Sequence, residues 1–208
     1  MKIDYSTCWR DESSLKEMVS AVRKHPKFED IGHGKIIIEL LNSIPEKNLN
    51  LLDLSCGGGH LSTITKDHKY TGSDMKHIVK NVSKKCYPKN KYIYLDVIED
   101  NLDILKSFDI IVMNAIIDIL EEPLFILDKI LKNCKKYVII HRQDITNYTL
   151  ENGFYLSKQE SYGGFTFHSI LNRMEFNNIL NNCGFSIIKE LNSGLGLQNN
   201  YSFLLKKD

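Results

Sequence analysis

The sequence has few of the features that mark disulfide-rich, zinc-binding or membrane-spanning proteins. Its five cysteines, at positions 8, 56, 86, 134 and 183, are widely separated, and no two of them form a C-x-x-C pair. An odd number of scattered cysteines argues against a disulfide framework and against a zinc site. No apolar run is long enough to span a membrane, and the first residues, MKIDYSTCWRDESS, are polar where a signal peptide is apolar. We therefore expect a cytoplasmic protein that does not associate with a membrane.

The chain also lacks an excess of charge of either sign. Its 27 Lys and Arg residues and 26 Asp and Glu residues give a formal net charge of +1. Proteins that bind a phosphate backbone show a basic patch or stripe, so nucleic acid is not expected as a partner. What the sequence does have is 208 residues with 42% apolar side chains, which is enough for one globular domain with a small extension.

Two helical segments precede a series of short strands. Apolar residues recur at helical spacing in ESSLKEMVSAVRKH and GKIIIELLNSI, so residues 1–46 are predicted to form an N-terminal helical cap. Further on, β-like runs alternate with segments near 59–66, 75–85, 121–133 and 172–182 that are typical of helices. The runs are LNLLDLS, KYTGSD, KYIYLDV, FDIIVMN, KKYVIIH, GFSIIKEL and YSFLLKK.

Strands joined by helices indicate a parallel sheet with helices on both faces. The last two runs follow each other without a helix between them and are expected to pair antiparallel at one edge. The predicted fold is therefore α/β: a doubly wound, Rossmann-like, mostly parallel seven-stranded sheet with an antiparallel edge strand and an N-terminal helical extension.

Two local signals and one irregular segment complete the predicted domain of residues 47–208. Asn172 and Glu175 have capping-box spacing at the start of a helix, and Gly184 is a typical stop signal after it. The segment 144–171 shows no strand or helix pattern and is rich in aromatic residues, including Tyr155 and Tyr162. Because long irregular segments inside compact domains are usually functional or disordered, we interpret 144–171 as a substrate-binding lid insertion.

The stretch LLDLSCGGGHLS, residues 51–62, places three consecutive glycines directly after a buried strand. In a doubly wound sheet, the turn after the first strand is the natural ligand site. A dinucleotide-binding turn requires G-x-G-x-x-G, and counting from Gly57 the third glycine position is occupied by Ser62. A nucleotide-sugar oxidoreductase that uses NAD is therefore disfavoured.

The pattern D-x-[GS]-C-G-x-G resembles motif I of the class I S-adenosylmethionine-dependent methyltransferases. It is formed here by Asp53, Ser55, Cys56, Gly57 and Gly59, and Ser55 stands where the family usually has glycine. The resemblance implies that the backbone of this turn packs against the amino-acid and ribose portions of S-adenosylmethionine, whose product is S-adenosylhomocysteine.

The ends of the second, third and fourth strands extend the resemblance over roughly residues 49–140. Asp74 closes the second strand, where the family places a carboxylate that accepts hydrogen bonds from both ribose hydroxyls. Asp96 closes the third strand, where the family has an acidic residue facing the adenine amino group. The resemblance thus implies a cofactor site that also contains Asp74, Met75, Asp96, Val97, Asn114 and Ala115.

A methyl acceptor with a hydroxyl group needs a base, whereas a phosphate or carboxylate is already anionic. His141 follows the fifth strand in YVIIHRQD and can act near neutral pH, with Asp144 close enough in sequence to hold its tautomer. His168, in the expected lid, is the second candidate base. The candidate catalytic residues are therefore His141, His168 and Asp144, and the candidate substrate-binding residues are Arg142, Tyr162 and Arg173.

The residues directly after the fourth strand narrow the acceptor class. The run NAII replaces the [DN]PP[YF] run of amino-methylating DNA and protein enzymes, which disfavours exocyclic-amine and glutamine substrates. The sequence shows no separate recognition domain, basic stripe or RNA-binding module, so a small molecule is favoured over a macromolecule. The HRQD run and the aromatic segment after it loosely resemble small bacterial methyltransferases of surface-polysaccharide pathways. This resemblance implies a sugar or sugar-nucleotide hydroxyl as the acceptor.

Other interpretations of the sequence stay open. An anionic or nitrogen acceptor is one alternative, and a non-catalytic partner protein that keeps the fold is another. No acidic cluster has the spacing of a magnesium site, so no metal is expected. The sequence leaves the oligomeric state open.

Overall fold

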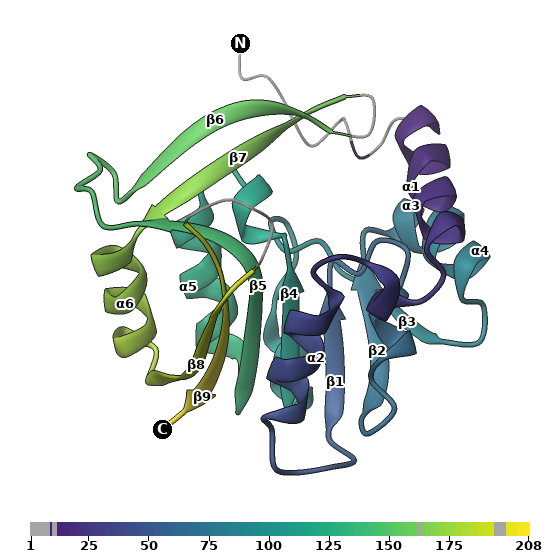
Figure 1. The fold of residues 1–208 in the computed structure, drawn as a ribbon, viewed down its shortest axis with the longest axis horizontal. Coiled ribbons are helices and arrows are strands. Elements are labelled where there is room, and N and C mark those ends of the chain that lie inside the picture. The colour runs from purple at the N-terminus through teal and green to yellow at the C-terminus, as the bar shows by residue number, and fades with distance from the viewer. Residues whose placement is uncertain (1–8, 10–11, 162–163, 194–198) are drawn as a thin grey trace.

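The computed structural model describes residues 9, 12–161, 164–193 and 199–208 (Figure 1). The strands are β1 (Asn50–Leu54), β2 (Lys69–Asp74), β3 (Lys91–Tyr94), β4 (Ile110–Asn114), β5 (Tyr137–Thr146), β6 (Phe154–Ser161), β7 (Gly164–Asn172), β8 (Phe185–Asn192) and β9 (Asn200–Lys207). The α-helices are α1 (Glu12–Lys24), α2 (Gly34–Asn42), α3 (Lys76–Ile78), α4 (Lys84–Cys86), α5 (Pro123–Asn133) and α6 (Arg173–Asn182). Short 3-10 helices are η2 (Phe28–Asp30), η3 (His60–Thr63), η5 (Asp103–Ser107) and η6 (Ile117–Ile119), and η4 (Val79–Ser83) is a π-helical turn.

The central sheet follows the predicted doubly wound order. β3, β2, β1, β4 and β5 are parallel neighbours in that order, and β9 pairs antiparallel with both β5 and β8. The order β3-β2-β1-β4-β5-β9-β8 confirms the mostly parallel seven-stranded sheet with an antiparallel edge. All five carboxyl ends of the parallel strands therefore point to one edge of the sheet.

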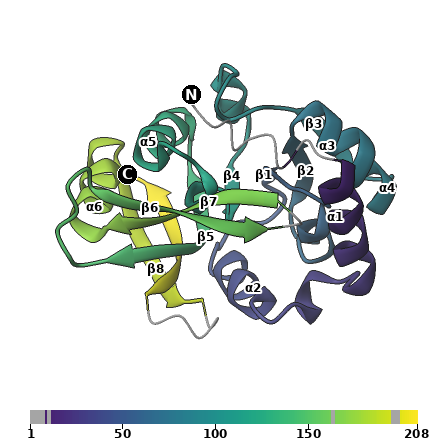
Figure 2. The ribbon, with the colours of Figure 1, turned by 90° about the horizontal axis from the view of Figure 1, so that it is seen from above.

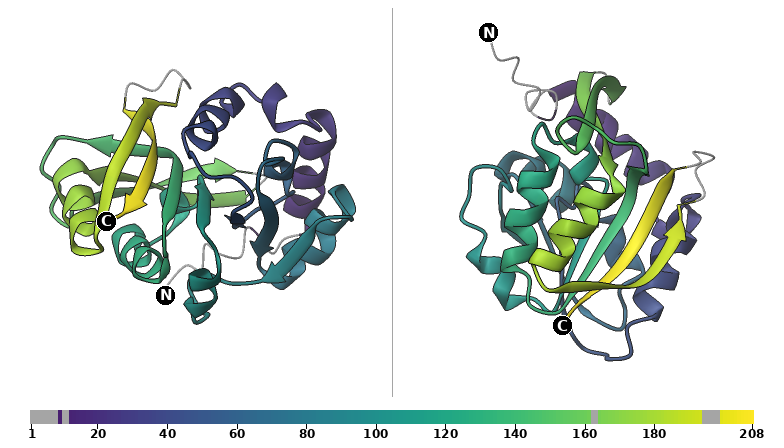
Figure 3. Two further views of the ribbon diagram at one scale, coloured as in Figure 1. Left: turned by 90° about the horizontal axis from the view of Figure 1, so that it is seen from below. Right: turned by 90° about the vertical axis from the view of Figure 1, so that its left-hand side faces the viewer.

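Helices cover both faces of this sheet (Figure 3). Alternate residues of β1 divide between two buried clusters: Leu51 packs with α2 on one face, and Leu52 packs with α5 and α6 on the other. This division explains why every residue of β1 after Asn50 is buried, since a strand covered on both sides has no solvent-facing residue. A third, smaller cluster joins α1 to α3 and η4.

The prediction that 144–171 lacks regular structure was wrong. β5 continues to Thr146, and β6 and β7 form an antiparallel hairpin in continuous register from Phe154↔Leu171 to Ser161↔Gly164. β7 joins the sheet beyond the end of β4, parallel to β5, with Asp144 opposite Ile170. From there the hairpin extends across the carboxyl ends of β4 and β1 toward α1 (Figures 1 and 2).

Most predicted helices are present with small changes in length. The segments near 75–85, 121–133 and 172–182 correspond to α3–η4–α4, α5 and α6, but 59–66 contains only the short turn η3. Asn172 caps α6, with its side-chain oxygen accepting from the Glu175 backbone N–H at 3.1 Å. Gly184 follows the helix with φ +70°, as a C-terminal stop requires. Within the described residues, no helix combines the length and apolar content needed to cross a bilayer.

Candidate active site

The glycine turn after β1 is tightly bent and hydrogen-bonded to the end of β2. Ser55, Gly57 and Gly59 have φ values of +58°, +52° and +80°. The Cys56 backbone N–H donates to the Ser73 carbonyl at 2.8 Å, and the Gly57 N–H donates to Asp74 Oδ2 at 2.8 Å. The left-handed conformation suits glycine at two of these positions and is costly for serine at the third.

Two of the three glycines are required by neighbouring side chains of the chain itself. A Cβ added to Gly58 would lie 2.2 Å from Val22 Cγ2 of α1, and a Cβ added to Gly59 would lie 2.7 Å from the Tyr92 hydroxyl oxygen of β3. Gly57, by contrast, is half-exposed. The helix α1 therefore lies directly on the turn. Of the turn, only the first part, residues 55–57, offers its backbone to a ligand.

Asp74 closes β2 beside this turn. Both of its carboxylate oxygens accept backbone N–H groups, Oδ2 from Gly57 and Oδ1 from Met75, each at 2.8 Å. Burial raises the pKa of Asp74 to about 6, against the opposing effect of these two hydrogen bonds. Each oxygen keeps a further lone pair, so the group can still accept hydrogen bonds from a vicinal diol.

The loop after β3 is held by an internal network and by one lysine. Asp96 Oδ1 accepts from the Ile98 N–H at 3.0 Å, and Asp100 Oδ2 accepts from the Asp96 N–H at 2.8 Å. The Lys129 ammonium of α5 donates to the carbonyl oxygens of Val97, Ile98 and Asp100 at 3.4, 3.1 and 3.0 Å. Val97 is buried and Asp96 is half-exposed.

Asp53 lies beneath the turn rather than on its surface. Its side chain is buried, and Oδ2 accepts a hydrogen bond from the Tyr70 hydroxyl at 2.9 Å. Burial raises the pKa of Asp53 to about 7, and the Asp74 carboxylate adds to that increase. The Asp53 side chain thus contacts the protein interior and not the surface of the turn.

Two more residues with left-handed backbone lie directly after β4 and at the bulge within β5. Ala115 and Arg142 have φ values of +53° and +64°, which are uncommon for residues other than glycine. Arg142 lies at the β-bulge of β5, and its Nε donates to Asn114 Oδ1 at 3.2 Å. With Ser55, three non-glycine residues at this sheet edge therefore adopt left-handed backbone, a concentration typical of functional sites.

His141 is enclosed in a buried chain of hydrogen bonds. Its Nδ1 lies 2.7 Å from Ser202 Oγ, and its Nε2 lies 2.9 Å from His33 Nδ1. Ser202 Oγ is also 2.6 Å from Ser193 Oγ. Burial lowers the pKa of His141 to about 2 and that of His33 to about 4. Because both ring nitrogens of His141 are occupied and its side chain is 1% exposed, the ring is not placed to meet a substrate.

His168 and Asp144 form the second histidine arrangement, and this one is accessible. His168 Nε2 lies 2.9 Å from Asp144 Oδ2, and the Asn200 amide donates to Asp144 Oδ1 at 2.6 Å. The hydrogen bond to Asp144 raises the pKa of His168 against the effect of burial. The His168 side chain is 26% exposed. Both oxygens of Asp144 are therefore engaged within the chain, one with the imidazole and one with the Asn200 amide.

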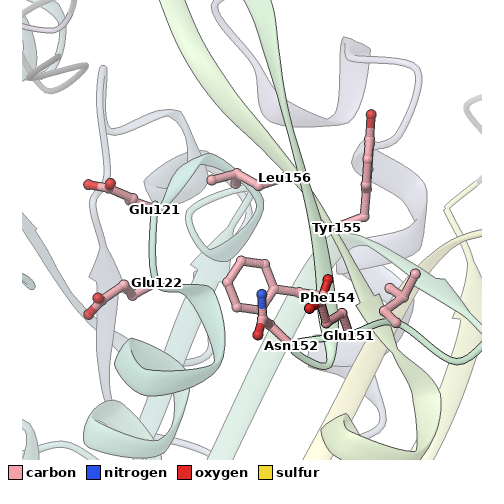
Figure 4. Close-up of a pocket in the computed structure, with 8 residues that line it drawn as sticks. Glu121, Glu122, Glu151, Asn152, Phe154, Tyr155 and Leu156 are labelled. Atoms are coloured by element: carbon pink, nitrogen blue, oxygen red, sulfur yellow. The ribbon is translucent and has the colours of Figure 1, made fainter. Parts of the chain in front are cut away.

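Two cavities flank the hairpin. One, of about 360 Å³, is lined by Asp144, Thr146, Tyr148, Leu150, Tyr155, Ile170 and Asn199. The other, of about 540 Å³, is lined by Glu121, Glu122, Leu150, Glu151, Asn152, Phe154, Tyr155 and Leu156. Figure 4 shows Phe154 and Leu156 pointing into this acidic cavity, while the Tyr155 ring points away from it. The glycine turn and Asp74 line neither cavity.

Arg173 does not join the residues at this edge. The Arg173 guanidinium binds Glu190 through both terminal nitrogens, at 3.0 and 2.7 Å, and lies over the rings of Tyr201 and Phe203. It therefore ties α6 to β8 and β9. Tyr162 lies outside the described residues. Among the described residues, no group of three or more His, Cys, Asp or Glu side chains is arranged to hold a metal ion.

Sequence reasoning missed several residues that shape the site. Lys129, Asn200 and Ser202 belong to no motif, and each acts on residues far away in the chain. Asp118 of η6 was also missed; burial raises its pKa to about 6, and its Oδ1 has no hydrogen-bond partner among the described residues.

One family model matches the chain. The model described as methionine biosynthesis protein MetW matches residues 35–148. No curated protein has a significant sequence match to the chain.

Solved structures resemble the whole chain at low identity. An amino pentose methyltransferase from Micromonospora echinaspora, CalS10, has a TM-score of 0.61 and 12% identity over 91% of this chain and 95% of that one. The N-terminal domain of EvdMO1, solved in the presence of S-adenosylhomocysteine and D-fucose, has a TM-score of 0.56 and 12% identity over 95% of this chain and 83% of that one. The magnesium protoporphyrin IX methyltransferase from Synechocystis has a TM-score of 0.61 and 11% identity over 93% of this chain and 87% of that one. At this level of identity the likeness shows the fold.

Proposed function

The protein belongs to the MetW family and has the class I S-adenosylmethionine-dependent methyltransferase fold, and we propose that it transfers a methyl group to a hydroxyl oxygen of a small molecule. The observation that carries this proposal is the accessible His168–Asp144 pair, which the hairpin places at the carboxyl edge of the parallel strands. Such a pair is the usual arrangement of a general base with an orienting carboxylate.

The residues at the edge suit the cofactor. S-adenosylmethionine, when bound, supplies a methyl group already activated by its sulfonium centre. The turn 55–57 offers its backbone, the Asp74 carboxylate suits the ribose hydroxyls, and Asp96 with Val97 forms the side that would receive the adenine. Asn114 closes β4, the strand between β1 and β5, and Ala115 follows it. These residues would align the methyl group with the acceptor oxygen, because the electrophile needs no activation by the protein.

His168 is the proposed base. With the Nε2 proton donated to Asp144, the neutral ring presents Nδ1 as the acceptor for the hydroxyl proton. Asp144 then stabilises the imidazolium that forms. His141, the other predicted base, is instead proposed to hold β5 against α2 and β9, because its two ring nitrogens bind His33 and Ser202.

A sugar is the proposed acceptor class. Two structural neighbours are described with an amino pentose and with D-fucose, which supports but does not fix the class. The hairpin β6–β7 is the proposed substrate lid, since it extends over the carboxyl ends of β4 and β1.

Calorimetric titration with S-adenosylmethionine and S-adenosylhomocysteine tests the cofactor, with Asp74→Ala as the control variant. Micromolar binding that is lost in the variant supports the proposal, and absence of binding contradicts it. Transfer of labelled methyl groups to a panel of sugars and sugar nucleotides then tests the base. A His168→Gln variant should lose turnover and keep cofactor affinity; full turnover would instead favour an acceptor that is already anionic.

A further inference from the structure

We propose that the cavity of about 360 Å³ beside the hairpin binds the pyranose ring of the methyl acceptor, with Tyr148 and Tyr155 packing against the ring. This inference rests on the proposed function and assigns its acceptor site. The cavity volume lies in the range of small-molecule sites.

The register of the hairpin places this cavity next to His168. Tyr155 is paired with Ile170, and Ser157 is paired with His168. Side chains two residues apart on a strand share a face, and cross-strand partners share it too. The Tyr155 ring and the His168 imidazole therefore project from the same face of the hairpin. Asp144 completes the connection, since it lines the cavity and binds His168.

Tyr148 and Tyr155 are exposed aromatic side chains on a fixed backbone. Their exposed fractions are 80% and 55%. The Tyr148 N–H donates to Thr146 Oγ1 at 3.2 Å, and the Tyr148 carbonyl accepts from the Asn172 amide at 2.7 Å. A held backbone limits the ordering cost of binding to the two side-chain torsions of the ring. The C–H face of a pyranose packs on such a ring, and its hydroxyls remain free for polar groups.

The polar groups of the cavity favour a neutral, hydroxyl-bearing ligand. No lysine or arginine lines it among the described residues, and Asp144 lies at its wall, so a phosphate or carboxylate group would meet a carboxylate and no cation.

The acidic cavity on the opposite face of the hairpin provides a contrast. It is lined by three glutamates, and the side chains of Phe154 and Leu156 that point into it lie on the face away from His168 (Figure 4). A ligand there would be separated from the proposed base by the hairpin itself.

Saturation-transfer NMR on the full chain with saturating S-adenosylhomocysteine tests the assignment. The probes are methyl glucopyranoside, methyl galactopyranoside, methyl fucopyranoside and dTDP-glucose, with catechol as an aromatic competitor. Tyr155→Leu and Tyr148→Leu should each weaken pyranoside binding about fivefold or more, whereas Tyr155→Phe should keep it within about twofold. Phe125→Leu, at a 63% exposed ring on α5, is the matched control and should leave binding unchanged.

Absence of saturation transfer to every sugar probe would overturn the assignment, as would equal binding by the leucine variants. Catechol binding with the same dependence on Tyr155 would show that the pocket takes a planar aromatic acceptor instead. Calorimetry of S-adenosylhomocysteine on the same samples separates the two proposals. Loss of cofactor binding contradicts the proposed function, while intact cofactor binding without sugar contact contradicts only the pocket.

Discussion

The Lys129 ammonium donates a hydrogen bond of 3.1 Å to the carbonyl oxygen of Ile98 and also reaches the carbonyls of Val97 and Asp100. One side chain of α5 thus fixes the backbone of the loop that comes after β3. The loop contains Asp96 and Val97, which the proposed function assigns to the adenine side of the cofactor. Lys129 is accordingly a positioning residue, acting through the loop.

Replacing Lys129 with methionine should weaken S-adenosylhomocysteine binding about three- to tenfold, because the loop then loses charge-assisted hydrogen bonds that preorganise it. Calorimetric titration measures the change. Lys132→Met is the matched control, since Lys132 lies on the same helix and pairs only with the Asp128 carboxylate at the surface among the described contacts. Equal affinity of the two variants would rule out a positioning role.

Ser55 has φ +58°, so glycine should be preferred over alanine at this position. We expect Ser55→Gly to be about 1 kcal/mol more stable than Ser55→Ala, as judged by urea unfolding. At Ser43, where φ is −80°, the order of the glycine and alanine variants should reverse. If alanine is preferred at both sites, the turn does not hold Ser55 in the left-handed region.

Cofactor affinity should fall as pH decreases below about 6. The pKa of Asp74 is raised to about 6 by burial, and diol hydroxyls donate to the ionised form, so protonation of this carboxyl removes the acceptor. The limiting slope is about tenfold in affinity per pH unit. Calorimetric titration with S-adenosylhomocysteine at about every half unit between about pH 7.5 and 5 measures this dependence of affinity on pH.

Asp53 titrates in the same region, because its pKa is raised to about 7 by burial. The variant Asp53→Asn should keep the loss of affinity at low pH if Asp74 is the group responsible. Loss of the pH dependence in this variant would assign it to Asp53 instead.

The buried pair His33 and His141 should make the fold less stable in acid. Burial lowers the pKa of His33 to about 4 and that of His141 to about 2, so between about 6.5 and these values the unfolded chain binds more protons than the folded one. The free energy of unfolding contributed by each group therefore decreases as pH falls below about 6.5. The slope is at most about 1.4 kcal/mol per pH unit for each histidine.

Urea unfolding of His33→Asn at pH 7.5 and 5.5 (about two pH units apart) tests this expectation. The asparagine amide can take the place of Nδ1 toward His141 and does not titrate, so the loss of stability between the two pH values should be smaller than in the wild type. Identical losses would show that His33 is protonated in the folded chain.

The parts of the molecule that could be predicted from sequence are those specified by local pattern. The apolar run of β1, the capping pair Asn172 and Glu175, and the carboxylate Asp74 at the end of β2 each depend on residues close together in the chain. Short-range periodicity and capping chemistry act within a few residues, which is why these elements lie where they were expected.

The features that could not be predicted depend on distant partners. The environment of His141 is set by His33 and Ser202, 108 and 61 positions away, and no local pattern distinguishes a buried histidine at a strand end from an accessible one. The hairpin was missed because β6, FYLSKQES, places consecutive polar residues where an alternating strand would carry apolar ones. The pairing of β6 with β7, which itself pairs with the end of β5, overrides that weak pattern.

The contact between α1 and Gly58 connects the glycine turn to the smallest of the three apolar clusters. Val22 packs on the turn, while α1 itself is held through Leu15 and Met18 against Ile78 and Val82, apart from the two clusters that sandwich the sheet. The strands of the sheet are packed on both faces, whereas α1, which covers the turn, is held by only a few side chains. We therefore expect local opening of that helix to uncover the glycines, so that a bulky adenosyl ligand would enter and leave past α1 rather than through the sheet.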